Sequence, residues 1–393
     1  MGVGKFLYFG TTTAMVLFAV TFSLIYSGTL TRLGAFTWVD DWTDDLGNRK
    51  FMGIAPAVHY GRDRGFSMDE IPLGGLKGRV YIVTGANSGL GFSSVYWLAS
   101  RGANVYMGCR SEKRCDDAAE RIRQRLAGEQ SGGIGTLTTL QLDLSSFKSV
   151  REFARRFLLG DQRLDGLMLN AGIMHPPYGL TADGIEQQIG VNHFGHFYLT
   201  RLLLPMMRLS ATKRPATIVV VSSSAHYRTY DHGVGTTLAQ LNDEEAYDPI
   251  SAYGQSKLAN VLFAQELARR ERGSNVLVNV IHPGVVDTEL ARFALERLRN
   301  YAGDSLGNFL TNYVFVPLSK AAFWSSDEAA LTQVYALVGP QLLAEKTTGK
   351  YFHPIARPNA PHSVYATDKH LQRNLWALSE SIVEKFEASQ KKR

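Results

Sequence analysis

Short apolar runs alternate along the middle of the chain with longer segments that have helical spacing. The runs lie near residues 79–84, 104–109, 137–142, 165–170, 216–222 and 275–281. Their apolar residues are continuous rather than alternating with polar ones, which is typical of strands buried on both faces of a parallel sheet. Right-handed crossovers between such strands give a doubly wound sheet. The pattern therefore predicts one α/β domain of the Rossmann type.

The N-terminal region has a different pattern. No charged residue occurs between Lys5 and Arg32, and that stretch exceeds the roughly 20 residues that a membrane-spanning helix needs. We expect residues 1–32 to form an uncleaved, single-pass transmembrane anchor in the endoplasmic reticulum or another endomembrane. A signal peptide is the alternative, although Tyr26-Ser27-Gly28 is a weak cleavage site. The flanking basic groups favour a cytosolic N-terminus, and the opposite topology stays open.

Three further segments follow from the same pattern. Residues 33–75 are expected to be a connector, residues 76–350 the folded domain, and residues 351–393 a C-terminal extension. Apolar residues in the extension recur every three or four positions, as on one face of a helix: Leu371, Leu375, Leu378, Ile382 and Phe386. We expect this helix to pack against the domain; a lid, a dimer contact and a membrane-surface helix are the alternatives.

Composition narrows the class of protein. Of the 393 residues, 45% are hydrophobic and 20% are charged, which fits a globular protein. The net charge is +6, but the basic residues are scattered, so no nucleic-acid partner is expected. The two cysteines, Cys109 and Cys115, fall on a predicted strand and the next helix, and no disulfide is expected. Because there is no C-x-x-C motif and no histidine cluster, no metal is expected either.

A glycine-rich loop follows the first apolar run. It reads Thr84-Gly85-Ala86-Asn87-Ser88-Gly89-Leu90-Gly91, and a helical segment begins after it. At such a strand-to-helix turn, free backbone N–H groups and the helix dipole favour an anion, and glycine lets a pyrophosphate approach the main chain. The G-x-x-x-G-x-G spacing alone is a weak signal, since ordinary tight turns also contain glycines. Its position between strand and helix favours a dinucleotide.

The end of the second run indicates which dinucleotide. Arg110 lies about 20 residues past the loop, where an NAD enzyme places an acidic residue on the ribose 2′-hydroxyl. An arginine there would instead pair with a 2′-phosphate through charge-assisted hydrogen bonds. We therefore expect NADP(H) rather than NAD(H). Alternatively, Arg110 belongs with Lys113 and Arg114 to a basic, solvent-exposed start of the next helix.

A tyrosine and a lysine provide the candidate proton chemistry. Tyr253 and Lys257 are four residues apart on a predicted helix, so they share one face. A free tyrosine has a pKa of about 10, and a nearby cation would lower that pKa. The ammonium group can also bind a ribose. The alternative is an exposed helix pair. Upstream, the run 216–222 leads into Ser222-Ser223-Ser224, and strand alternation cannot separate Ser222 from Ser224.

Taken together, these motifs resemble those of the short-chain dehydrogenase/reductases over roughly residues 76–350. Asn170-Ala171-Gly172, Asn192, and Pro283-Gly284 with Thr288 occur in that family's order. A closer resemblance is to the retinol dehydrogenase-like branch, through Met107-Gly108-Cys109-Arg110, Ser222-Ser223-Ser224-Ala225-His226 and the stretch 256–263. The resemblance implies hydride transfer between a nicotinamide and a carbonyl carbon.

The resemblance also implies roles for individual residues. Tyr253 would be the general acid in reduction and the base in oxidation, and Ser223 would bind the substrate oxygen. Lys257 would lower the tyrosine pKa and bind the ribose, and Asn192 would support a proton-relay water. The cofactor-binding set would be Gly85, Asn87, Ser88, Gly89, Leu90, Gly91, Arg110, Asp143, Leu144, Asn170, Ala171, Gly172, Tyr253, Lys257, Pro283, Gly284, Val286 and Thr288. For Asp143 a helix cap, and for Asn170 a turn residue, are the alternatives.

The substrate is less constrained. Aromatic and aliphatic residues are frequent in the stretch 289–325, and a hydrophobic cover would suit a retinoid- or lipid-like molecule; ordinary helix packing is the alternative. We expect a hydrophobic small-molecule substrate, contact with the lipid bilayer, and possible homo-oligomers as in the family. The rival functions are oxidation of a sterol or polyprenol alcohol, a non-catalytic NADP-binding regulatory protein, and reduction of a ring double bond of the protochlorophyllide type.

Overall fold

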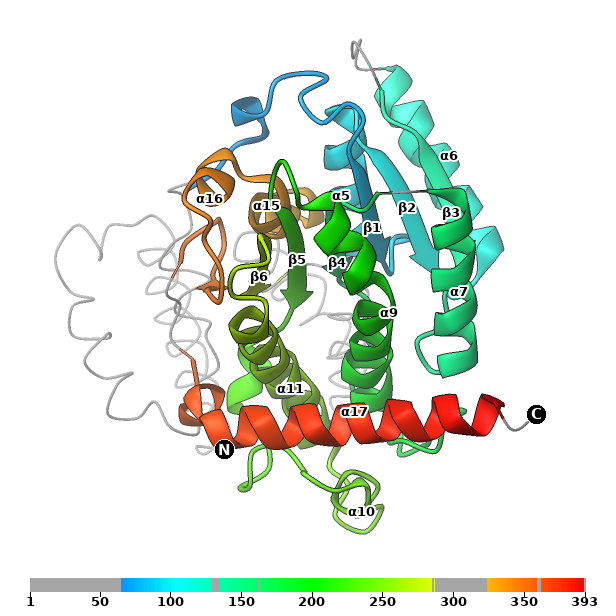
Figure 1. Ribbon diagram of the computed structural model, residues 1–393, viewed down its shortest axis with the longest axis vertical. Helices are drawn as coiled ribbons and strands as arrows, with labels where there is room; N and C mark the ends of the chain where they lie inside the picture. The colour runs from blue at the N-terminus through cyan, green and yellow to red at the C-terminus, as the bar shows by residue number, and fades with distance from the viewer. Residues whose placement is uncertain are drawn as a thin grey trace, which may run out of the picture.

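The structure is a computed structural model that describes residues 65–128, 134–161, 163–284, 286, 324–358 and 362–391. At its centre is a sheet of seven parallel strands in the order β3-β2-β1-β4-β5-β6-β7 (Figure 1). The strands are β1 (Val80–Thr84), β2 (Asn104–Cys109), β3 (Leu137–Gln141), β4 (Gly166–Leu169), β5 (Ala216–Val221), β6 (Val276–Ile281) and β7 (Tyr351–Phe352). The predicted doubly wound parallel sheet is confirmed.

Six of the strands coincide with the predicted apolar runs, and β7 was missed. This edge strand has only two residues, which pair with Val280 and Ile281 of β6. A pair of residues is too short to produce a periodic signal.

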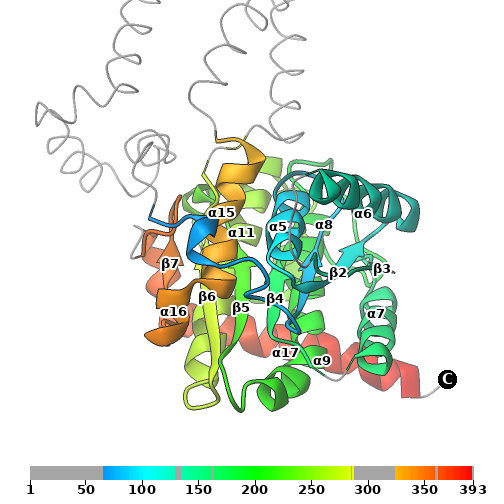
Figure 2. The same cartoon turned by 90° about the horizontal axis from the view of Figure 1, so that it is seen from above.

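Helices cover both faces of the sheet. The α-helices of the described residues are α5 (Gly89–Ser100), α6 (Glu112–Ala127), α7 (Phe147–Gly160), α8 (Gln187–Ile189), α9 (Gly195–Ser210), α10 (Leu238–Leu241), α11 (Pro249–Arg270), α15 (Ser326–Val338), α16 (Pro340–Ala344) and α17 (Lys369–Lys391). Alternate residues of β1 enter two separate cores. Tyr81 and Val83 join the core under α5, α6 and α15, whereas Val80 and Ile82 join the core under α7, α9 and α11 (Figure 2).

The strand order changes direction between β1 and β4. From β1 the chain moves outward to β2 and β3, then returns to β4 on the other side of β1. A ligand crevice forms outside the carboxyl ends of the strands at such a switch point. Gly85 and Asn170 follow the two strands that flank it, so the glycine loop and the Asn170 segment meet there.

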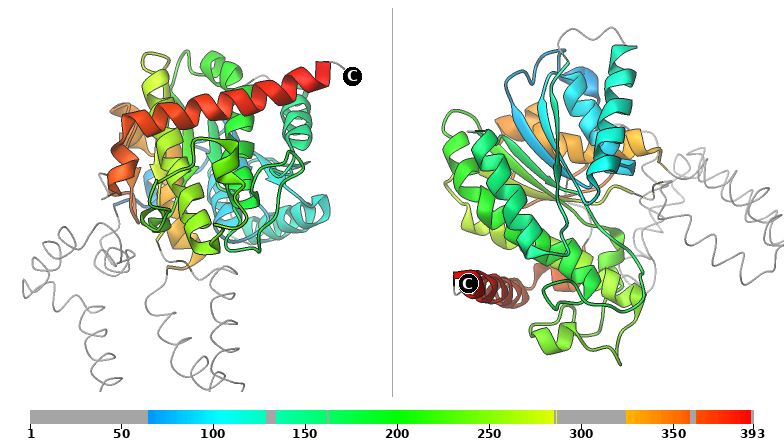
Figure 3. Two further views of the ribbon diagram at one scale, coloured as in Figure 1. Left: turned by 90° about the horizontal axis from the view of Figure 1, so that it is seen from below. Right: turned by 90° about the vertical axis from the view of Figure 1, so that its right-hand side faces the viewer.

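The C-terminal helix α17 runs across the ends of the helices on one face (Figure 3). Leu371, Leu375 and Val383 are buried against that face. The ring of Trp376 lies 5.1 Å from that of Phe197 on α9 and 6.0 Å from that of Phe263 on α11. The apolar face that the spacing predicted therefore packs against the body of the domain.

Several predictions fall on residues outside those that the structure describes. They include the anchor within residues 1–32, most of the connector 33–75, Thr288, and the stretch 289–323 of the expected hydrophobic cover. Within the described ranges, no helix combines the length and apolar character needed to cross a membrane.

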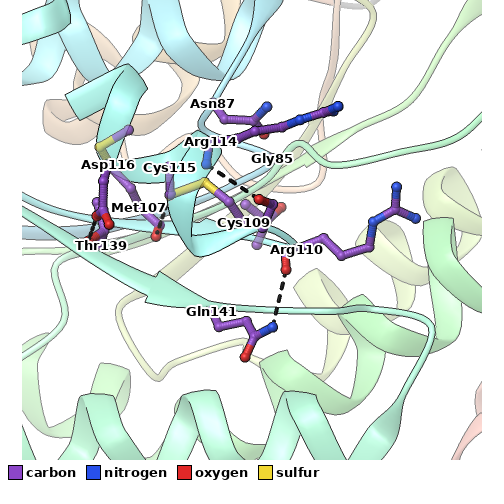
Figure 4. The surroundings of a disulfide bond; sticks show 12 residues. Gly85, Asn87, Met107, Cys109, Arg110, Arg114, Cys115, Asp116, Thr139 and Gln141 are labelled. Atoms are coloured by element: carbon purple, nitrogen blue, oxygen red, sulfur yellow. Dashed lines mark hydrogen bonds between the residues drawn. A yellow bond between two sulfur atoms is a disulfide. The ribbon is translucent and has the colours of Figure 1, made fainter. Parts of the chain in front are cut away.

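The expectation that the cysteines are unpaired is wrong. Cys109 and Cys115 are joined by a disulfide, with their Cα atoms 5.8 Å apart (Figure 4). The two residues belong to separate elements, and their spacing in the sequence does not show how close those elements lie. In the structure, the short connection after β2 turns back at once into α6, so the first turn of that helix lies beside the end of the strand.

Candidate active site

The three glycines of the loop are required for two different reasons, a left-handed backbone and close packing. Gly85 has a φ of +66° and Gly89 a φ of +52°, in the left-handed region that glycine adopts readily. A Cβ atom on Gly91 would lie 2.2 Å from the carbonyl oxygen of Gly85 and 2.8 Å from Nδ2 of Asn170. The start of α5 is therefore pressed against the loop.

The first turn of α5 exposes backbone donors. Ser88 is the N-cap residue, but its side chain makes no capping hydrogen bond. The first N–H groups of a helix have no partner within the helix, and they are suited to a phosphate together with the helix dipole. Leu90 lies in this turn and Asn87 and Ser88 directly precede it, which gives the predicted pyrophosphate site its local geometry.

Thr84 and Asn170 join the ends of β1 and β4. The hydroxyl oxygen of Thr84 accepts hydrogen bonds from the backbone N–H groups of Asn170, at 2.9 Å, and Ala171, at 3.0 Å. In return, Nδ2 of Asn170 donates to the carbonyl oxygen of Thr84 at 2.9 Å. Asn170 therefore links the ends of β1 and β4 beside the crevice. Neither the predicted cofactor contact nor the turn alternative described this structural role.

Arg110 extends from the end of β2 beside the glycine loop (Figure 4). It is exposed, and no carboxylate among the described residues forms an ion pair with it. The neighbouring Lys113 differs, because its ammonium lies 3.3 Å from the carboxylate of Asp117. The guanidinium of Arg110 can therefore serve an anionic ligand without breaking an ion pair.

Asp143 and Leu144 follow β3. One carboxylate oxygen of Asp143 accepts from the N–H of Ser145 at 3.0 Å and from its hydroxyl at 2.7 Å. The N-cap of α7 is Ser146, so the helix-cap alternative for Asp143 is wrong: the side chain closes a turn. Leu144 is buried in the core.

The candidate catalytic residues meet beyond the end of β5. Tyr253 and Lys257 lie on one side of α11, are both buried, and place Nζ 5.6 Å from the centre of the tyrosine ring. Ser223 lies near enough to Tyr253 to lower the pKa of its hydroxyl. Ser222 instead donates to the carbonyl oxygen of Lys257 at 2.8 Å. Of these two serines, Ser223 faces the tyrosine and Ser222 braces α11.

Burial dominates the titration of this pair. Desolvation raises the pKa of Tyr253 to about 12, and the side chain of Ser223 opposes that rise. Desolvation also lowers the pKa of Lys257 to about 8, while its ammonium donates to the carbonyl oxygen of Val221 at 3.2 Å. The direction for Tyr253 differs from the expected lowering by lysine, because the cost of burying a phenolate is the largest effect on this hydroxyl.

Asn192 lies in a π-helical segment, Gly190–Phe194, between α8 and α9. Its side chain accepts from the N–H of Ile173 at 2.8 Å and donates to the carbonyl oxygen of Ile173 at 3.0 Å. It also donates to the hydroxyl of Ser256 at 2.8 Å. Asn192 thereby connects the segment after β4 to the turn of α11 that carries Tyr253 and Lys257. π-Bulges of this kind are frequent at functional sites.

Two glycines close the other walls of the site. A Cβ atom on Gly172 would lie 3.2 Å from Oδ1 of Asn192 and 3.4 Å from Nζ of Lys257. Gly284, after Pro283, has a φ of +86°, and a Cβ atom there would lie 2.7 Å from the ring of Trp324. Val286 pairs with Trp324 in an isolated bridge.

Sequence reasoning missed His175 as a neighbour of the site. Its ring lies edge-on to that of Tyr253, with the centroids 5.5 Å apart, and its φ is 58°. Non-glycine residues in this conformation are uncommon and cluster at functional sites. No motif marks this position; only the fold brings the two rings together.

Comparisons with known proteins identify what this arrangement is similar to. A family model described as short chain dehydrogenase matches residues 79–235 and 241–298. Retinol dehydrogenase 14 of Mus musculus is 41% identical over 314 residues, which cover 78% of this chain and 86% of that protein. The Homo sapiens protein of the same name is 39% identical over 361 residues, or 90% and 96% of the two chains. The crystal structure of an uncharacterised protein from Mycobacterium paratuberculosis superposes with a TM-score of 0.58 at 33% identity, covering 81% of this chain and 98% of the other.

Proposed function

Because the chain belongs to the short-chain dehydrogenase/reductase family and is retinol dehydrogenase-like, we propose that it is a membrane-anchored, NADP(H)-dependent oxidoreductase. Its reaction would interconvert a carbonyl and an alcohol on a hydrophobic, retinoid- or lipid-like substrate. The observation that carries the proposal is the buried pair of Tyr253 and Lys257 on one side of α11, with the lysine Nζ 5.6 Å from the centre of the tyrosine ring.

The side chains would divide the proton chemistry among them. The nicotinamide, when bound, supplies or accepts the hydride. In reduction Tyr253 would donate its hydroxyl proton to the substrate oxygen, and with a pKa of about 12 it is protonated at neutral pH. Ser223 would donate a hydrogen bond to the same oxygen as negative charge develops there. In oxidation Tyr253, as the phenolate, would instead accept the proton of the substrate hydroxyl.

Lys257 and Asn192 would replace the proton that Tyr253 gives up. The lysine ammonium lies close to the tyrosine ring, and Asn192 is tied to Ser256, one residue before Lys257. A cation at this position stabilises the phenolate left after proton transfer. The fixed position of Asn192 would let its main chain hold the relay water.

NADP(H) use is supported by Arg110, whose guanidinium has no ion pair among the described residues. A 2′-phosphate can accept two parallel N–H bonds from it. The hydrophobic substrate is supported by the similarity to proteins named retinol dehydrogenases and by the aromatic stretch 289–325. Anchoring is supported by the uncharged stretch between Lys5 and Arg32.

The test is NADPH consumption by the full-length protein, purified in detergent, with all-trans-retinal and a panel of lipid aldehydes and ketones. General acid–base catalysis contributes about 10²–10⁴-fold, so Tyr253→Phe should lower kcat by at least about 100-fold while NADPH still binds. Tyr365→Phe is the matched control, because that hydroxyl bonds to the backbone of Asp231 away from the site. Equal activity of wild type and Tyr253→Phe would favour the regulatory alternative.

A further inference from the structure

A buried histidine outside the predicted site residues links two parts of the site. His196 lies at the start of α9, one helical turn after Asn192, and is 1% exposed. Its Nδ1 lies 3.0 Å from the main-chain carbonyl oxygen of Asn192. Its Nε2 lies 2.9 Å from the hydroxyl oxygen of Thr84, at the end of β1. Both ring nitrogens of His196 are therefore within hydrogen-bond distance of atoms of the site.

The partners of the His196 ring determine which of its nitrogens carries the proton. A hydroxyl has one proton and two lone pairs, and both lone pairs of Thr84 accept backbone N–H groups, from Asn170 and Ala171. The one hydroxyl proton of Thr84 has two acceptors within reach, Nε2 of His196 at 2.9 Å and the carbonyl oxygen of Met168 at 3.4 Å, and the shorter distance assigns it to Nε2. A carbonyl oxygen can only accept, so Nδ1 carries the imidazole proton and donates it to Asn192. One neutral tautomer satisfies every partner, and burial lowers the pKa of His196 to about 4.

The bond to Asn192 lies where the chain passes from the π-helical segment into α9. In the π-helical segment the main-chain bonds run to the fifth residue, as from the N–H of Gly195 to the carbonyl oxygen of Gly190. The carbonyl of Asn192 receives a side-chain N–H, one turn along the helix, from His196. The orientation of this carbonyl therefore depends on a side chain as well as on the helix.

We propose that His196 is a positioning residue that fixes the main-chain carbonyl of Asn192 relative to the glycine loop. Through Thr84 the same ring reaches the backbone of Asn170 and Ala171, so the proton-relay segment and the cofactor crevice are held in one arrangement. This inference rests on the function proposed above, in which Asn192 supports the proton relay.

Two conservative substitutions separate the two bonds. The amide nitrogen of an asparagine can occupy the place of Nδ1, so His196→Asn keeps a donor for Asn192 and loses the acceptor for Thr84. The longer glutamine places its amide near Nε2, so His196→Gln keeps the acceptor for Thr84 and loses the donor for Asn192. We would measure kcat and KM for the best carbonyl substrate, and the Kd of NADPH by fluorescence titration. A hydrogen bond lost in a buried site costs about 1–3 kcal/mol, or roughly 5- to 150-fold.

The expected result is a crossed pattern. His196→Gln should lower kcat about tenfold or more and change the Kd of NADPH less than twofold. His196→Asn should raise that Kd about threefold to tenfold and leave kcat within about threefold of wild type. The matched control is Ser379→Ala on α17: this buried hydroxyl accepts from His193 and lies outside the relay segment, so its loss should lower the melting temperature and leave kcat and Kd unchanged.

Other outcomes distinguish this inference from the proposed function. Equal effects of the two His196 variants on kcat and Kd, in proportion to their loss of thermal stability, would overturn the positioning role. If the wild type bound NADPH but reduced no carbonyl, the proposed function would fail. The Kd of NADPH for the two His196 variants would still show whether the bond between His196 and Thr84 supports cofactor binding. Identical Kd values for the wild type and the two His196 variants would then overturn the inference that His196 positions the cofactor crevice.

Discussion

Arg110 is the residue that we expect to choose between the two nicotinamide dinucleotides. Hydrogen bonds to a charged partner are worth about 1.5–3 kcal/mol, so Arg110→Ala should lower kcat/KM for NADPH by about 10- to 100-fold and change kcat/KM for NADH little. Lys113→Ala is the matched control, since that exposed lysine already pairs with Asp117. Steady-state kinetics with both cofactors provides the measurement; an unchanged NADPH/NADH ratio in Arg110→Ala would remove the basis for NADP(H) specificity.

Lys257 should make NADPH binding depend on pH. Burial lowers its pKa to about 8 in the protein alone, whereas a bound ribose would accept hydrogen bonds from the ammonium and favour the charged form. Below pH 8 the lysine is already charged, so affinity should be constant. Above pH 8 binding must take up a proton, so the Kd should rise, by at most about tenfold per pH unit.

Fluorescence titration of NADPH between pH 7 and pH 9.5 would measure this dependence. Lys257→Met removes the titrating group, so its Kd should be weaker than that of the wild type at pH 7 and flat over the same range. A wild-type Kd that stays flat through pH 8 to 9 would contradict the linkage, and so would a slope that Lys257→Met retains.

Individual site residues could be predicted from the sequence where they belong to a recognisable motif. Tyr253, Lys257 and Ser223 follow from short patterns, and the structure brings them together at the end of β5. Thr84 opens the glycine motif, yet its hydroxyl contacts with Asn170 and His196 join three elements distant in sequence. Such contacts depend on how the elements pack, and spacing along one chain does not contain that information.

At the scale of whole elements, α17 should contribute to stability through one buried hydroxyl. Ser379 is fully buried and donates to the carbonyl oxygen of Leu375 at 2.8 Å. It therefore accepts from Nε2 of His193 at 2.9 Å. Ser379→Ala leaves that N–H unsatisfied, at a cost of about 1–3 kcal/mol. For a protein of this size the melting temperature should fall by roughly 2–10 °C.

Thermal denaturation of Ser379→Ala beside Ser389→Ala would test this contribution. Ser389 lies on the same helix, is exposed, and donates only to the carbonyl oxygen of Phe386, so its loss should change the melting temperature by less than about 1 °C. Equal melting temperatures of the two variants would mean that α17 is held by its apolar face alone.

Elements were predictable to the extent that their residues repeat. The strands appear as continuous apolar runs, and the apolar face of α17 appears as a three- or four-residue spacing. The π-helical segment around Asn192 has no such signature, because the shift to a fifth-residue bond is set by packing. The disulfide was missed for a related reason: the tight turn between β2 and α6 decides the distance between Cys109 and Cys115.

The whole molecule gathers its chemistry at one edge of the sheet. Parallel strands all end at the same edge, so the glycine loop after β1, Asn170 after β4 and Ser223 after β5 had to converge. That convergence was predictable from the strands alone. The order of the strands was not, because an apolar run does not specify its neighbour.

Membrane attachment is a property of the whole chain that the sequence predicts from residues outside the described ranges. A lysine at the centre of a spanning helix costs about 2.5–3.5 kcal/mol. The double variant Leu17→Lys/Val20→Lys places two in the middle of the uncharged stretch. We expect wild-type full-length protein to stay in the membrane pellet after alkaline carbonate extraction, and this variant to be released.

The control for this experiment is Val3→Lys, which lies before Lys5 and outside the uncharged stretch. It adds a positive charge without entering the hydrocarbon region, so it should stay in the pellet with the wild type. Release of the wild-type protein by carbonate would mean that the stretch between Lys5 and Arg32 does not span a bilayer. A helix with two central lysines loses most of the free energy that favours its insertion into the bilayer. Retention of the double variant in the pellet would therefore mean that another part of the chain attaches the protein to the membrane.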